Sequence, residues 1–229
     1  MVVQSLRFGP TMVFIDLSHT ISDGLETYPG LPAPAIRSHL TFEESEASFT
    51  DGSHFSIAEI TMVANTGTYI DTPGHRFPGG DDLADLELEQ VADLPGTVID
   101  ASEIDARAVP VSLLPAHDIG GHAVLVRTDW SRLFGTREYT LDAPYLSTEL
   151  CEALIEHGVE IVGIDSLNID RTDTGERPVH TNLLAAEVLP VEHLTNLAQI
   201  DPARPFRFFA VPPRVRGMGT FPIRAFAIQ

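Results

Sequence analysis

One stretch organises this chain: Asn65-Thr66-Gly67-Thr68-Tyr69-Ile70-Asp71-Thr72-Pro73-Gly74-His75. The apolar, alternating residues 55–63 precede it and are typical of a half-buried strand. At Asn65 this pattern gives way to glycine, threonine, proline and ionisable side chains. We therefore expect a strand that leads into a loop with reactive side chains, because binding and catalytic residues often lie on loops that a rigid scaffold positions.

The composition limits the class of protein. The 229 residues are 43% hydrophobic and 21% charged, as in an ordinary globular protein with a substantial core. The net charge of −19 argues against nucleic acid and anionic membrane as partners, because both require basic surfaces. The single cysteine, Cys151, excludes an internal disulfide. No apolar run reaches the roughly 20 residues that span a bilayer, and residues 1–11 lack the features of a signal peptide, so we expect a cytoplasmic enzyme.

Strand patterns outnumber helix patterns along the chain. Short apolar runs bounded by turns predict strands over residues 13–17, 35–40, 55–63, 96–100, 122–127, 159–164, 207–211 and 223–228. Helical spacing predicts helices over residues 83–94, 148–157 and 180–187. The second helix has the clearest signals, because Ser147 can cap its start and Gly158 its end. With no repeat and no linker, we expect residues 1–229 to form a single α/β domain with more strand than helix.

Two groups of residues are candidates for chemistry. Positions two apart on an extended segment share a face, so Tyr69, Asp71 and His75 are expected to converge, although a turn cap is the favoured role of Asp71 on local sequence alone. In the second group, His180 begins a predicted helix and Glu192 follows twelve residues later. Histidine and carboxylate side chains are ligands of divalent cations, but the spacing has no regular metal-binding pattern.

The ordered motifs of this chain resemble the cyclase / kynurenine formamidase-like metal hydrolase family. The central stretch is similar to the family signature HxGTHxDxPxH, and the resemblance extends over nearly the full chain. It continues through residues 14–18, 28–30, 162–166, 180–184, Glu192 and 222–225. The resemblance implies a swivelling β/β/α fold, a homodimer or homotetramer, and hydrolysis of an amide or lactone carbonyl in a small molecule.

The chain departs from that signature at two positions. Asn65 and Tyr69 stand where typical members have metal-binding histidines. At the matching positions, the resemblance implies that the remaining metal ligands are Asp71, His180 and Glu192. It leaves Asn65 as a further oxygen donor. Amide and phenol oxygens are poorer zinc ligands than imidazole. We therefore expect one divalent ion, zinc or manganese, bound weakly or absent altogether.

The retained residues favour a hydrolase with metal-activated water. The resemblance implies that His75 is the acid/base, and Tyr69 is a candidate donor to the oxyanion. Two alternatives stay open: a metal-free lyase or isomerase that uses His75 and Tyr69, and an inactive protein that only binds a small molecule. Arg214 and Arg216 lie in a glycine-proline loop, where an arginine can hold a substrate carboxylate; a surface ion pair is their favoured alternative role.

Overall fold

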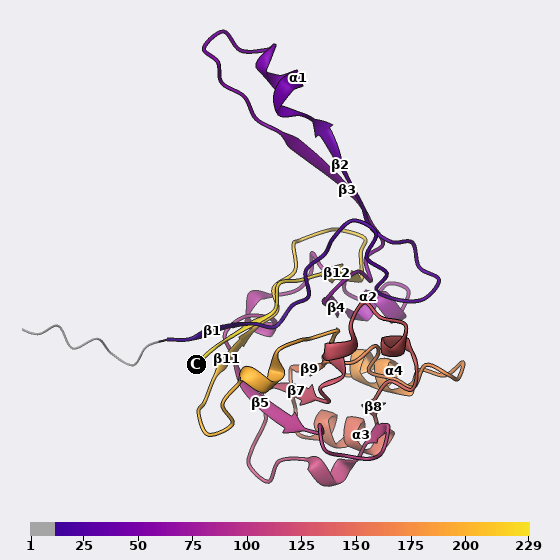
Figure 1. The fold of residues 1–229 in the computed structure, drawn as a ribbon. Coiled ribbons are helices and arrows are strands. Elements are labelled where there is room, and N and C mark those ends of the chain that lie inside the picture. Colours follow the sequence, from indigo (N-terminus) through magenta and orange to yellow (C-terminus); the bar gives the residue numbers. More distant parts are fainter. Residues whose placement is uncertain (1–11) are drawn as a thin grey trace, which may run out of the picture.

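The chain folds around one large sheet, which runs through the body of the molecule in Figure 1. The structure is a computed structural model and describes residues 12–229. The predicted absence of a signal peptide concerns residues 1–11 and lies outside the described residues. Within the described range the sheet has nine strands, in the spatial order β1 (Phe14–Asp16), β13 (Phe226–Ile228), β11 (Arg207–Phe209), β5 (Leu94–Asp100), β7 (Ala123–Arg127), β9 (Ile161–Ile164), β10 (Leu189–Glu192), β4 (Tyr69–Asp71) and β12 (Thr220–Pro222).

The middle of this sheet is parallel. β5 pairs with β7, β7 with β9, and β9 with β10 in parallel register. Successive side chains of a strand point to opposite faces, and in β7 both sets are buried: Ala123 and Leu125 join one apolar cluster, and Val124 and Val126 join another. Burial on both faces accounts for the continuous apolar runs that predict these strands.

Two helices cover one face of the sheet. α3 (Thr148–Glu156) and α4 (Pro178–Ala185) contact each other, and Leu150 and Leu183 place their side chains in the same apolar cluster. Ser147 caps α3 as predicted, because its Oγ accepts a hydrogen bond from the Leu150 N–H at 3.1 Å. The prediction of an α/β fold with more strand than helix is confirmed. No helix within residues 12–229 is long and apolar enough to cross a membrane.

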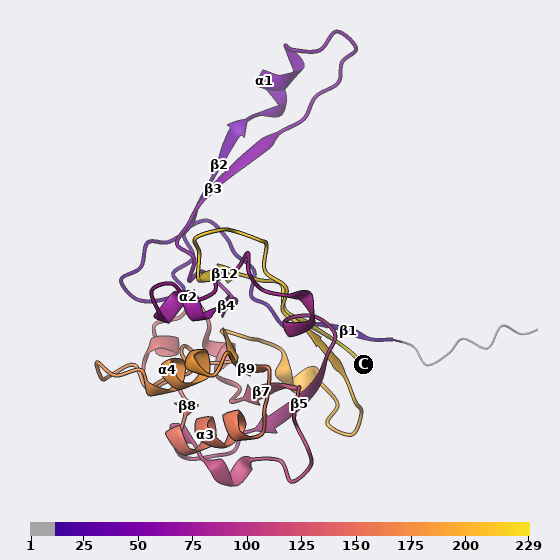
Figure 2. The same cartoon turned by 180° about the vertical axis from the view of Figure 1, so that it is seen from behind.

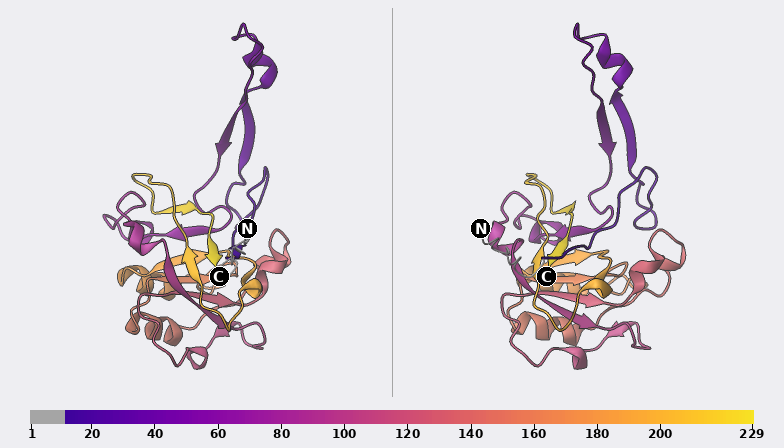
Figure 3. Two further views of the ribbon diagram at one scale, coloured as in Figure 1. Left: turned by 90° about the vertical axis from the view of Figure 1, so that its left-hand side faces the viewer. Right: turned by 60° about the vertical axis from the view of Figure 1, so that its left-hand side comes forward.

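A long arm projects from the body (Figures 2 and 3). It consists of the antiparallel strands β2 (Ala35–Leu40) and β3 (Ile57–Thr61), with the short helix α1 (Phe42–Glu46) near its tip. Every residue of β3 is exposed, so the prediction of a half-buried strand over residues 55–63 is right about the strand and wrong about its burial. The alternating apolar pattern is present, but no other layer of the described chain covers it.

Two further local predictions are wrong. Residues 83–94 do not form one helix: they contain turns and the 3₁₀ helix Leu88–Gln90. Asp93 has a φ of +56°, a left-handed conformation that ends any helix before β5 begins. The central stretch is also more regular than the expected loop. Its residues 69–71 form the buried strand β4, and a short helix, α2 (Pro73–Arg76), follows directly.

Candidate metal centre and active site

Strand pairing brings together residues that lie far apart in the sequence. β4 lies between β10 and β12 and is antiparallel to both. In this register Tyr69 faces Glu192 on one side, and Asp71 faces Thr220 on the other. Immediately after β4, α2 carries His75, which contacts Thr220. The sheet register therefore assembles one site from three separate parts of the chain.

Three buried side chains converge there with the chemistry of a metal centre. Asp71, His180 and Glu192 each offer one ligand atom, and these atoms lie within 4.8 Å of one another. His180 Nε2 is 3.5 Å from Asp71 Oδ2 and 3.4 Å from Glu192 Oε1. Asp71 Oδ2 is buried and has no hydrogen-bond partner in the described part of the chain. A buried carboxylate oxygen requires a compensating cation, so these residues fit a divalent metal ion.

A second carboxylate orients the histidine of this cluster. Asp170 Oδ2 lies 2.7 Å from His180 Nδ1, and the Asp170 carboxylate also accepts the backbone N–H groups of Val179 and His180 at 2.8 Å. With Nδ1 engaged, Nε2 is left to face the two other candidate ligands, as in many metal sites. Sequence reasoning missed Asp170. Its only signal is an acidic residue shortly before a predicted helix, a position that suits the capping of first-turn N–H groups.

Burial and the neighbouring charges shift the pKa values of the cluster in opposite directions. Burial lowers the pKa of His180, but the Glu192, Asp170 and Asp71 carboxylates outweigh it and raise this pKa to about 10. Burial raises the pKa of Glu192, and the His180 imidazolium opposes that rise. The three carboxylates therefore favour the protonated form of His180. A divalent ion would take the place of that proton as the positive charge between the carboxylates.

Tyr69 takes part in the cluster as a hydrogen-bond donor. Its hydroxyl lies 2.5 Å from Glu192 Oε2, and Asn168 Nδ2 donates to the same oxygen at 3.3 Å. Burial, followed by the nearby Glu192 and Asp71 carboxylates, raises the pKa of Tyr69 well above its usual range, so the phenol keeps its proton. That proton is held by Glu192, which conflicts with the predicted role of Tyr69 as the donor to a substrate oxyanion.

His75 has the geometry of a proton carrier. Its Nδ1 lies 2.8 Å from Thr220 Oγ1, and the Thr220 hydroxyl donates a close hydrogen bond to Asp71 Oδ1. A hydroxyl has one proton to give. Because that proton goes to Asp71, His75 Nδ1 must be the protonated nitrogen that donates to Thr220. The His75 side chain is 35% exposed, and Nε2 is the ring nitrogen that is not engaged by Thr220.

These residues open onto a cavity of about 420 Å³, a suitable size for a small organic molecule. The predicted site residues that line it are Asn65, Tyr69, His75, His180 and Glu192. The loop of residues 28–31 forms another part of its wall, and two arginines that sequence reasoning missed, Arg76 and Arg177, also line it.

The structure does not bring Arg214 and Arg216 into this cavity. The Arg214 guanidinium donates to the backbone carbonyl of Ala84 at 2.8 Å. Arg216 forms ion pairs with Asp85 at 2.6 Å and with Asp82 at 3.3 Å. For Arg216 the structure therefore shows the surface ion pair that was its favoured alternative role.

Comparison with known proteins gives consistent results for family and fold. Residues 15–171 match the family model described as a putative cyclase. The kynurenine formamidase of Bacillus cereus is 27% identical over 217 residues, which cover 94% of this chain and 97% of that protein.

Two solved structures show the same fold. A protein described as a potential metal-dependent hydrolase with cyclase activity superposes with a TM-score of 0.76 at 22% identity, over 95% of this chain and 98% of the other. Isatin hydrolase A from Ralstonia solanacearum superposes with a TM-score of 0.76 at 24% identity, over 95% and 92% of the two chains.

Proposed function

This chain belongs to the cyclase family, and we propose that it is a metal-dependent hydrolase that cleaves the carbonyl bond of a small amide or lactone. The observation that carries the proposal is the buried Oδ2 of Asp71, which lacks a hydrogen-bond partner among the described residues and converges with His180 and Glu192 beside a cavity. The similarity to a kynurenine formamidase supports an amide as the substrate.

In this proposal each residue of the site has one task. A divalent ion held by Asp71, His180 and Glu192 would polarise the carbonyl and activate water. The free Nε2 of His75 accepts the proton of the attacking water and then delivers it to the leaving nitrogen or oxygen. Thr220 holds the His75 ring in the required tautomer and orientation.

We further propose that the site holds a single ion, zinc or manganese. Tyr69 offers a protonated phenol where a second imidazole would be needed, and its proton is bound to Glu192. The remaining donors are two carboxylates and one imidazole. Such an oxygen-rich set suits manganese well, whereas zinc more often has several nitrogen or sulfur ligands.

Metal analysis combined with turnover tests this function. Protein purified without chelator should contain about one divalent ion per chain and should hydrolyse members of a panel of formanilides and aryl lactones. Chelation should abolish both properties, and Asp71→Asn should do the same, whereas Asp201→Asn, an exposed control, should change neither. Full turnover of the panel after chelation would contradict the metal-dependent mechanism, and no turnover of the panel by metal-loaded protein would contradict the hydrolase. Binding of the panel without turnover, in metal-loaded protein, would favour a binding protein.

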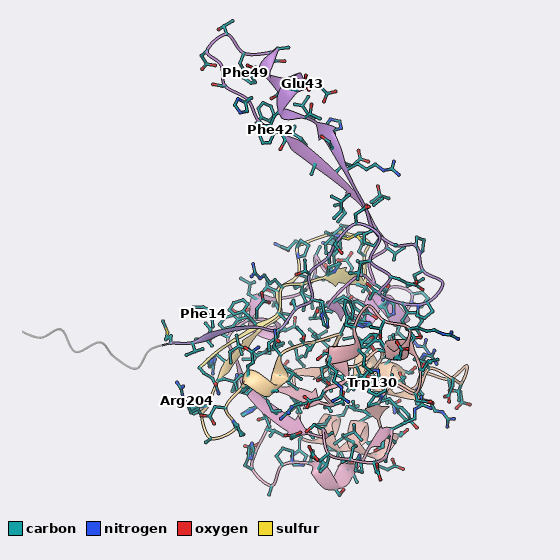
Figure 4. The ribbon with its side chains drawn as sticks, viewed as in Figure 1. Phe14, Phe42, Glu43, Phe49, Trp130 and Arg204 are labelled. Carbon is teal, nitrogen blue, oxygen red and sulfur yellow. The ribbon has the colours of Figure 1, made fainter. Side chains whose placement is uncertain are left out.

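We also propose that the arm mediates a homo-oligomer. The exposed apolar side chains of the arm include Ile36, Phe42, Phe49, Phe55, Ile57 and Ile60, each at least 39% exposed. Figure 4 shows Phe42 and Phe49 on the outer part of the arm, away from the body. An isolated two-stranded hairpin is at best marginally stable in water, so this arm requires a covering surface, and a second copy of the chain can offer one.

Light scattering tests the oligomer. The wild-type protein should be a dimer or tetramer, and the double substitution Ile57→Asp with Ile60→Asp should make it monomeric. Leu88→Asp changes an equally apolar side chain that is 64% exposed on the body, and it should leave the mass unchanged. A wild-type monomer at micromolar concentration would refute the proposal.

A further inference from the structure

We infer that the substrate carries a carboxylate, which Arg76 holds at the cavity with Arg177 beside it. The inference rests on the proposed function, because it names the class of amide or lactone that the hydrolase takes. Its starting point is the charge of the chain. The lysine and arginine total of 14 consists of arginines alone, and the net charge is −19, so positive side chains are scarce in this protein.

Most of the arginines whose side chains have a polar partner in the described structure form an ion pair with an aspartate of the same chain. In the described residues, ion pairs to aspartate involve Arg107, Arg127, Arg171, Arg207, Arg216 and Arg224. Arg76 and Arg177 differ, because no ion pair to a carboxylate is found for either within residues 12–229, although both line the cavity. The chain therefore places two uncompensated guanidinium groups where a substrate enters.

Arg76 is held in a fixed orientation by its inner nitrogen. Its Nε donates to Thr181 Oγ1 at 3.1 Å, and Thr181 in turn donates to the backbone carbonyl of Arg177 at 2.7 Å. This contact ties the Arg76 side chain to the first turn of α4 and leaves its two outer nitrogens for a ligand. A guanidinium that presents two N–H groups side by side matches the two oxygens of a carboxylate.

Arg177 has a structural task as well as its place in the cavity wall. Its Nη1 donates to the backbone carbonyls of Arg171, Thr174 and Glu176 at 2.7 to 3.0 Å. These bonds close the loop before α4 and keep the positive charge of Arg177 beside the cavity. Arg177 therefore adds to the local positive potential, whereas Arg76 has the donors free to contact the anion directly.

The position of Arg76 relates the anion to the reacting groups. Arg76 follows His75, the proposed acid/base, and Thr181 follows His180, a proposed metal ligand. The guanidinium is therefore anchored between the two segments that carry the chemistry. The cavity wall also includes Tyr28, which packs on a buried cluster with Tyr139. This arrangement fits a small aromatic amide or lactone with its carboxylate on the α2 side.

Binding measurements test the inference without any need for turnover. Benzoate and benzamide have the same ring and nearly the same size, but only benzoate has the charge. Calorimetry should show that wild-type protein binds benzoate more tightly than benzamide. Arg76→Met should lower the affinity for benzoate by about 10–100-fold, the range for a charge-assisted hydrogen bond. It should leave the affinity for benzamide unchanged. Arg76→Lys should recover part of the loss. Arg204→Met, which removes an exposed arginine outside this cavity, should behave as wild type.

Two results would overturn the inference: equal binding of benzoate and benzamide by the wild-type protein, or unchanged benzoate binding by Arg76→Met. Kinetics separates such a failure from a failure of the proposed function. If formanilide and its ring-carboxylated analogue are hydrolysed equally well, and Arg76→Met alters neither KM, the hydrolase stands and the carboxylate site falls. If wild-type protein turns over no amide or lactone but discriminates benzoate through Arg76, the hydrolase falls and the carboxylate site stands.

Discussion

Thr220 Oγ1 lies 2.8 Å from His75 Nδ1, although 145 positions separate the two residues in the sequence. The same hydroxyl donates to Asp71, so a chain of hydrogen bonds runs from a candidate metal ligand to the candidate acid/base. The contact exists because β12 pairs with β4, which places Thr220 opposite Asp71. Thr220 is therefore a positioning residue: it sets which nitrogen of His75 is free to act on the substrate.

Substitutions at these two positions should have graded effects on catalysis. His75→Ala removes the proton carrier and should lower kcat by about 10²–10⁴-fold, the usual range for general acid–base catalysis. Thr220→Val keeps the shape but loses the hydroxyl, so it should lower kcat less and leave KM nearly unchanged, while Thr220→Ser should restore activity. Steady-state kinetics over a range of pH measures both.

A merely structural role would give a different pattern. If His75 serves only the fold, His75→Ala should keep kcat and its pH profile but lower the melting temperature. If Thr220→Val and Thr220→Ser are equally active, the hydroxyl does not position the imidazole.

The backbone of Gly219 lies close to that of His75, and this contact provides a second test of how the site is assembled. A β-carbon built on Gly219 would lie 2.2 Å from the backbone nitrogen of His75, far inside van der Waals contact. Gly219→Ala should therefore displace α2 from β12, lowering both the melting temperature and kcat. Thermal unfolding and kinetics measure the two effects.

The matched control for this substitution is Gly175→Ala. A β-carbon at Gly175 would meet no heavy atom within 4 Å, and no positive φ applies there. This variant should keep wild-type stability and activity. Equal behaviour of the two variants would show that the contact between Gly219 and His75 is not needed for the site.

Sequence patterns predicted a helix or strand correctly where the signals for it lie within the segment itself. The helix at α3 has its own cap, apolar face and stop, and the buried strand β7 has a continuous apolar run. The arm shows the limit of this reasoning. Its alternating residues predict a strand correctly, but alternation cannot tell which surface will cover the apolar side.

The site was predictable only in part, for the same physical reason. Resemblance to a family signature identified Asp71, His180 and Glu192, which the structure brings together. It did not reveal Thr220 or Asp170, because their roles depend on strand register and on the start of α4 rather than on spacing along the chain. The sequence also did not single out the arginines that line the cavity, Arg76 and Arg177, because strand register and the fold of the loop before α4 bring them there.

Buried histidines should make the folded state sensitive to acid. Burial lowers the pKa of His19 to about 4, and its Nε2 has no hydrogen-bond partner among the described residues. An unfolded histidine titrates at about 6.5, so between these pH values the unfolded state binds more protons than the folded one. The contribution of His19 to stability is therefore complete above about pH 6.5 and is lost as the pH falls toward 4.

The substitution His19→Phe should reduce this sensitivity. The His19 ring is stacked on Phe134, with centroids 3.7 Å apart, and phenylalanine can keep that stacking without a titrating group. The fall in melting temperature between pH 7.5 and pH 5 should be smaller than in wild type, though not zero, because burial also lowers the pKa of His193 to about 3. His54→Phe, at an exposed position on the arm, is the control and should change nothing. Parallel pH curves for wild type and His19→Phe would refute the assignment.

The altered signature positions should decide how strongly the site binds zinc. Tyr69 is 2% exposed and donates a hydrogen bond to Glu192, while Asn65 lines the cavity. An imidazole is a far better neutral ligand for zinc than an amide oxygen or a phenol, which must first lose a proton with a pKa near 10. The double substitution Asn65→His with Tyr69→His should therefore raise zinc affinity by about 10²-fold or more and should allow a second ion to bind.

The same substitution should change thermal stability in a metal-dependent way. A ligand that binds only the folded state stabilises it, so added zinc should raise the melting temperature of the double variant more than that of wild type. Titration calorimetry and thermal unfolding, each with and without zinc, measure both effects. The control adds Asp71→Ala to the double variant, which removes the carboxylate with the unpartnered oxygen and should cancel most of the gain. If the double variant binds zinc no better than wild type, the backbone around positions 65 and 69 no longer directs side chains at the cluster, and the metal-free alternative becomes the better account of the chain.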